Sequence, residues 1–202
     1  MTDEPVPTAF SPTWRAGSRT SPPRIADEPT TLVAFLVWHR TTFELKCAGV
    51  RSDQLSERTV PPSTLSLHGV LRHLAGVEGW WFARQFAGQS SLPPGVTPLY
   101  TFDDDPDADF DDLDGDVDEA FRVWRAACDR SRAIVAGADS LDALGTPVVG
   151  EPFSLRWLMV HMIAEYARHN GQSGSSARAD RRRSRRIVWG RRVERRTPPR
   201  SQ

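Results

Sequence analysis

The sequence of 202 residues predicts an all-α fold, namely a single bundle of four helices. Three observations favour this class. Apolar residues recur at spacings of three and four over four separate stretches, which is typical of amphipathic helices. No long alternation of apolar and polar residues indicates a strand. With 39% hydrophobic residues and seven Trp, the chain has enough apolar material to bury a core.

The first helix is expected after a leader without structure. Residues 1–28 contain five prolines among Ser and Thr and have no apolar period, so this segment is predicted to be disordered. Thr30 or Thr31 can serve as the N-cap of the helix, and Gly49 is expected to end it. The predicted buried stripe consists of Leu32, Phe35, Leu36 and Phe43.

The second helix is expected to run from Ser66, as its N-cap, to about Gly88. Its predicted buried stripe consists of Leu67, Val70, Leu71, Leu74, Val77 and Trp81. Residues 89–115 follow as a long connection rich in Pro, Gly and Asp, and such connections are commonly functional or disordered. We expect this segment to be a solvated acidic loop.

Two further helices complete the predicted bundle. Asp116 and Glu119 form a capping box for the third, which is expected to end by Gly137. The fourth is expected to begin at Ser154 and to end near Asn170 and Gly171. Its predicted stripe consists of Leu155, Leu158, Met159, Met162, Ile163 and Tyr166.

Composition excludes several classes of protein. The longest uninterrupted apolar run, Leu32 to Trp38, is far shorter than the roughly 20 residues that a membrane span requires. No secretory signal sequence opens the chain. Cys47 and Cys128 are too few for a disulfide scaffold and lack the spacing of a zinc knuckle. We therefore expect a soluble, cytoplasmic protein that makes no use of a membrane.

The net charge of zero conceals two regions of opposite charge. Residues 173–202 contain eleven Arg against Asp180 and Glu194, which gives +9 and leaves −9 for the rest. This basic and Ser-rich tail is expected to be disordered. It has two competing explanations, which are an arm that contacts nucleic acid through phosphates and the product of a shifted reading frame in a GC-rich gene.

The chemistry-bearing residues gather on the predicted fourth helix. His161, Glu165 and His169 recur every fourth position, so successive members lie one turn apart on one face. Glu165 and His169 border the apolar stripe, and a polar row facing a core requires a reason. His73 holds a similar position on the second helix.

Two histidines and one carboxylate from facing helices form a three-ligand set for Zn²⁺ or a similar divalent ion, with one position left for water or substrate. The competing interpretation is structural. In that case Glu165 and His169 form an exposed helix pair, and His73 is a core histidine with its hydrogen bonds satisfied.

Two segments carry a resemblance to a known family. They are SLHGVLRHLAGVEGWWF over residues 66–82, with His73 and Glu78, and SLRWLMVHMIAEYARHNGQ over residues 154–172, with the polar row. The chain resembles the DinB-like superfamily over roughly residues 28–172, and more closely an uncharacterised actinobacterial branch of it. It is also similar to the metal-binding domain of mycothiol-dependent maleylpyruvate isomerase.

This resemblance implies an up-down-down-up bundle, often a homodimer, that holds a divalent metal such as Zn or Ni. His73 matches the ligand of the second helix, and Glu165 and His169 match the pair on the fourth. Many DinB-like proteins have His in place of Glu165, whereas the isomerase branch has Glu. The implied partners are a small-molecule thiol, with mycothiol as a possible co-substrate, and a small electrophile.

Three more residues are candidates for the surroundings of the metal. Glu78 and Arg168 are expected to contact a ligand or substrate or, with better odds, to lie on solvated helix faces. His161 is expected to replace Glu165, to lie behind it or to be structural. Two other functions stay open, namely a non-catalytic dimeric bundle acting as a stress or interaction protein, and nucleic-acid contact through the tail.

Overall fold

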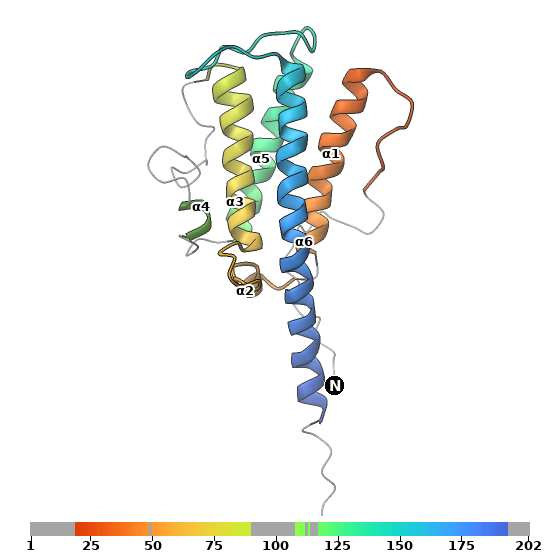
Figure 1. Ribbon diagram of the computed structural model, residues 1–202, viewed down its shortest axis with the longest axis vertical. Coiled ribbons are helices and arrows are strands. Elements are labelled where there is room, and N and C mark those ends of the chain that lie inside the picture. The colour runs from red at the N-terminus through yellow and green to blue at the C-terminus, as the bar shows by residue number, and fades with distance from the viewer. Residues whose placement is uncertain (1–18, 49, 90–107, 112, 114–116, 194–202) are drawn as a thin grey trace, which may run out of the picture.

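The computed structural model describes residues 19–48, 50–89, 108–111, 113 and 117–193, with side chains described as far as Gly174. Within these residues the fold is all-α, as predicted, and the one strand-like pairing is an isolated bridge between Leu144 and Ser154. The bundle consists of α1 (Glu28–Cys47), α3 (Leu67–Glu78) with its continuation, α5 (Val117–Ala136) and α6 (Leu155–Val193) (Figure 1). Two short helices, α2 (Ser52–Leu55) and α4 (Ala108–Asp111), lie beside it.

Helix α1 begins earlier than expected. Asp27 is its N-cap, and the Asp27 carboxylate accepts a hydrogen bond from the backbone N–H of Thr30 at 2.8 Å. The predicted stripe is wrong at Phe35, whose side chain is 40% exposed. The buried row follows Leu36, Arg40 and Phe43 instead, because these residues share one helical face toward the bundle interior.

The second predicted helix is two structures in series. Ser66 caps α3 as expected, its hydroxyl accepting from the N–H of Gly69 at 3.0 Å. After Glu78 the chain continues as the π-helix η1 (Gly79–Phe86). The wider winding of a π-helix changes which side chains face inward. Phe82 and Phe86 are therefore buried, while Trp81 of the predicted stripe is only partly buried.

The four long helices follow the up-down-down-up order that the resemblance implied (Figure 1). Glu28 and Arg156, at the starts of α1 and α6, form an ion pair, so these two helices run the same way. Arg130, late in α5, donates to the side chain of Gln89 just beyond η1, so α3 and α5 run together in the other direction. Helix α6 packs along α1 and also contacts α3 (Figure 1).

Helix α5 ends at Ala136, as predicted, whereas its expected capping residue Asp116 lies outside the described residues. Residues 1–18 of the expected leader (1–28) and most of the acidic connection lie outside them as well. In the part of the chain that is described, no helix is both long and apolar enough to cross a membrane.

The expected end of the fourth helix near Asn170 and Gly171 is wrong. Helix α6 has 39 residues and continues to Val193, so its blue end projects well beyond the other helices (Figure 1). No proline interrupts the sequence between Leu155 and Val193, and Arg and Ala are good helix formers. The division into leader (1–28), bundle (29–172) and tail (173–202) stays a prediction.

Candidate metal centre

Three side chains from two helices meet beside the core. His73 of α3 and Glu165 and His169 of α6 each offer one ligand atom, and these atoms all lie within 4.8 Å of one another. The predicted trio is therefore brought together in space.

The local structure explains how the trio forms. Glu165 and His169 are four residues apart in a continuous α-helix, which stacks them one turn apart. Nε2 of His169 lies 3.5 Å from Oε2 of Glu165. His73 approaches from α3, and its ring centroid lies 4.6 Å from that of His169. The donor set thus depends on how α3 and α6 are placed against each other.

The electrostatics favour the neutral form of His169. The residue is 7% exposed, and burial, together with the neighbouring His73, lowers its pKa from 6.5 to about 4. A neutral imidazole keeps the nitrogen lone pair that a metal requires. Nδ1 of His169 is buried and has no hydrogen-bond partner among the described residues.

The geometry fits a divalent ion of the zinc type. Donors bonded tetrahedrally to Zn²⁺ at about 2.1 Å stand about 3.4 Å apart. The 3.5 Å separation of His169 and Glu165 already matches that spacing. The widest separation in the group, within 4.8 Å, requires only a small movement of side chains. Two nitrogens and one carboxylate oxygen are also ligands that suit Zn²⁺.

Two neighbours border the trio. Arg168 donates from Nη1 to Oε1 of Glu165 at 2.7 Å, so it contacts a candidate ligand, although its own side chain is largely exposed. Phe110 of α4 stacks on His73, with ring centroids 5.2 Å apart and an interplanar angle of 30°. Phe110 was not predicted as a neighbour of the trio. The only signal for it is an aromatic residue within an Asp-rich stretch.

His161 is not part of the three-residue group. Its ring stacks on Trp157, with centroids 4.9 Å apart and an interplanar angle of 8°, and it also contacts Trp81 at 4.4 Å. Burial lowers its pKa, and its Nε2 has no hydrogen-bond partner among the described residues. The two tryptophans around His161 were not anticipated as its neighbours.

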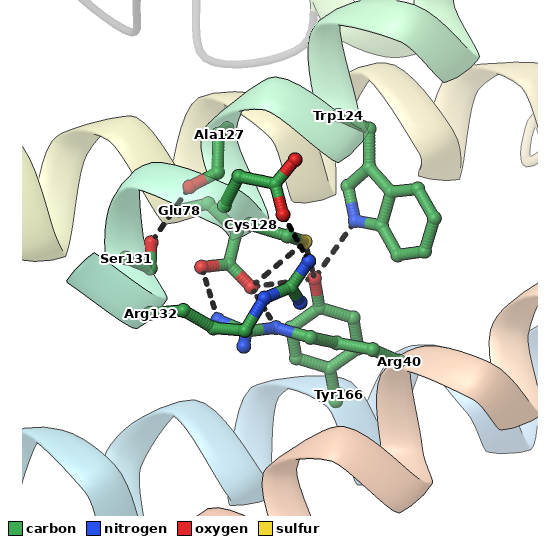
Figure 2. A network of polar contacts seen from close by, with 9 residues as sticks. Arg40, Glu78, Trp124, Ala127, Cys128, Ser131, Arg132 and Tyr166 are labelled. Atoms are coloured by element: carbon green, nitrogen blue, oxygen red, sulfur yellow. Dashed lines mark hydrogen bonds and ion pairs between the residues drawn. The ribbon is translucent and has the colours of Figure 1, made fainter. Parts of the chain in front are cut away.

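The expected solvated position of Glu78 is wrong. The side chain is completely buried and forms a bidentate ion pair with Arg40 of α1 (Figure 2). Its hydrogen bonds also involve Tyr166 and Cys128. Burial alone would raise the pKa of Glu78, but the charge and hydrogen bonds of Arg40, together with the hydrogen bonds of Ser131 and Tyr166, outweigh it and lower that pKa. Glu78 is therefore an ionised group inside the bundle.

The two remaining histidines, His39 and His68, have structural partners. His68 is buried, and its Nδ1 lies 2.8 Å from the hydroxyl oxygen of Ser56. The amide of Asn170 donates to the backbone carbonyl of His39 at 3.0 Å. Neither histidine joins the trio.

The sequence matches a known protein family. A family model described as mycothiol S-transferase matches residues 31–175, which is more than half of the chain and includes all three residues of the trio. No curated protein matches the sequence.

Proposed function

The chain belongs to the mycothiol S-transferase family, a DinB-like family, and on this premise we propose that it is a cytoplasmic, divalent-metal-dependent enzyme that transfers a thiol such as mycothiol to a small electrophile. The observation that supports this proposal best is the gathering of three candidate ligand atoms within 4.8 Å. The family match covers the same residues.

In this proposal His73, Glu165 and His169 hold a Zn²⁺ or Ni²⁺ ion. A dication bound there would lower the pKa of a thiol, which would favour the nucleophilic thiolate near neutral pH. His169 contributes a neutral nitrogen because its environment suppresses protonation. Glu165 acts as a ligand and not as a general base, since a carboxylate bonded to an ion is no longer free to take a proton.

The neighbouring residues orient and shield the trio. Arg168 holds one carboxylate oxygen of Glu165, which leaves the other oxygen, 3.5 Å from His169, for the ion. Phe110 covers one face of His73 and reduces the access of water to that side. In the proposed reaction the sulfur of the thiol co-substrate would bond to the electrophilic carbon of the second substrate. The leaving group on that carbon would depart with its electron pair, and the thiol proton would pass to solvent.

The first test is the metal content of the purified protein after loading with Zn²⁺. We expect about one ion per chain, and we expect His169→Ala and Glu165→Gln to lose it. His161→Gln is the matched control, because it removes a half-buried histidine from the same helix but outside the trio. Absence of bound Zn²⁺ in the wild-type protein contradicts the proposal.

The second test is catalytic. The Zn²⁺-loaded protein is incubated with mycothiol and a panel of small electrophiles, and conjugates are detected by mass spectrometry. We expect conjugate formation that the His169→Ala variant lacks. A protein that binds one ion but forms no conjugate with any electrophile fits a structural metal in a non-catalytic bundle instead.

A further inference from the structure

One buried carboxylate is contacted by side chains from all three other helices of the bundle. Glu78 of α3 accepts from Arg40 of α1, through Nε at 2.8 Å and Nη2 at 2.6 Å. The hydroxyl of Tyr166, on α6, donates to Oε1 of Glu78 at 2.7 Å. Sγ of Cys128, on α5, lies 3.6 Å from the same oxygen (Figure 2). The position of α3 is therefore tied to that of every other helix in the bundle.

The direction of the hydrogen bonds through Tyr166 is fixed. Nε1 of Trp124 donates to the Tyr166 hydroxyl oxygen at 2.8 Å. An indole N–H can only donate, so the hydroxyl accepts from Trp124 and gives its own proton to Glu78. An ionised carboxylate can only accept, which completes the chain. Removing the Tyr166 hydroxyl thus leaves the buried N–H of Trp124 without its acceptor and takes one donor from Glu78, which keeps Arg40 and Cys128 as partners.

This chain of hydrogen bonds lies beside the candidate ligands. Tyr166 directly follows Glu165 and precedes His169 by three positions, while Glu78 lies five positions after His73. A rise of about 1.5 Å per residue places the Tyr166–Glu78 bond within about 8 Å of the ligand positions along either helix. A slip of one residue moves a helix by about 1.5 Å and rotates its side chains by about 100°. Such a slip would carry His73 away from the α6 pair.

We propose that Tyr166 and Glu78 are positioning residues for the metal centre, and that their hydrogen bond sets the register of α3 against α6 that places His73 opposite Glu165 and His169. Neither residue belongs to the trio, so both act through the helices that carry it. The inference rests on the proposed function in one respect, namely that the trio binds a divalent ion.

The variant that tests this inference is Tyr166→Phe, which removes the hydroxyl and keeps the buried ring. Leu36→Ala is the control, because it weakens the core at α1 without touching the Tyr166–Glu78 bond. Zn²⁺ affinity is measured by competition with a chromophoric chelator, at a temperature where circular dichroism shows both variants folded. We expect Tyr166→Phe to bind Zn²⁺ about tenfold more weakly and Leu36→Ala to bind like the wild type. Equal affinities in the two variants overturn the inference.

A second measurement needs no metal. The rings of His73 and His169 have centroids 4.6 Å apart, close enough for a nuclear Overhauser effect between their ring protons in the metal-free protein. We expect this signal in the wild type and in Leu36→Ala, and its loss in Tyr166→Phe. A wild type that shows the signal but binds no Zn²⁺ refutes the proposed function, while the loss in Tyr166→Phe still supports the positioning role. A signal retained in Tyr166→Phe overturns that role.

Discussion

Arg40 and Glu78 form a bidentate ion pair in the interior of the bundle, between residues 38 positions apart on helices that run in opposite directions. Both side chains are buried, and the guanidinium holds the pKa of Glu78 low against the opposing effect of burial. Burial lowers the pKa of Arg40, but the charge and hydrogen bonds of Glu78, together with Cys128 and Tyr166, outweigh this effect, so the pKa is raised. Each charge is therefore tolerated in the core because of the other.

We expect Glu78→Gln to lower the free energy of unfolding by about 3–5 kcal/mol, since it leaves the buried charge of Arg40 without compensation. The double variant Arg40→Met/Glu78→Leu removes both charges and is expected to recover most of that loss. Urea unfolding of the wild type and both variants measures this. A double variant no more stable than Glu78→Gln would show that the pairing of charges is not the cause.

The lowered pKa of His169 predicts a pH dependence of stability in the metal-free protein. Between pH 6.5 and about 4 the unfolded chain binds a proton at this position and the folded chain does not. The stabilising contribution of His169 is therefore fully present above pH 6.5. It is lost as the pH is lowered from 6.5 to about 4, which reduces the free energy of unfolding by up to about 3 kcal/mol. The measurement is chemical unfolding at several pH values, with His169→Gln as the control that lacks this component. An identical slope in the variant contradicts the prediction.

The stacking of Phe110 on His73 predicts a kinetic effect on metal release. In Phe110→Ala, water and chelators reach the His73 side of the trio more easily, and we expect Zn²⁺ to leave about tenfold faster. Phe110→Leu keeps apolar cover and is expected to fall between this variant and the wild type. Stopped-flow mixing of Zn²⁺-loaded protein with excess chelator gives the rates of Zn²⁺ release. Equal rates in all three proteins would show that Phe110 does not shield the trio.

The basic segment predicts salt-dependent binding to nucleic acid if it acts as an arm. Each phosphate contact contributes about −0.9 to the slope of log K against log salt concentration for duplex DNA. We expect a steep slope for the full chain and none for a chain that lacks residues 173–202, measured by fluorescence anisotropy. Equal binding by the truncated chain excludes the arm. The nucleotide sequence decides the alternative, since a frameshift requires an aliphatic helical continuation in another frame.

The grouping of Glu165 and His169 could be predicted because it depends on local geometry. Any α-helix brings residues four apart onto one face, whatever surrounds it. The approach of His73 could also be inferred, because the apolar stripes of the two helices indicate which faces meet. The first rule is local to one helix, and the second requires only the apolar stripe of each helix, so both can be read from one sequence.

The burial of Glu78 could not be predicted in this way. Its partner, Arg40, lies on another helix, and nothing local distinguishes this carboxylate from one on a solvated face. Two other features could not be predicted for the same reason, namely the change to π-helical winding after Glu78 and the stacking of Phe110 on His73. Both depend on how separate segments pack, and that is decided by the whole bundle.

Helix α6 carries Glu165 and His169 and continues without interruption to Val193. At about 1.5 Å per residue, the helix extends about 36 Å past His169. A flexible linker absorbs a pull or a twist, whereas a rigid rod transmits it to its fixed end. A partner that moved the projecting end of α6 (Figure 1) would therefore also move the helical turns that carry Glu165 and His169, because α6 is one continuous helix held against α1 and α3.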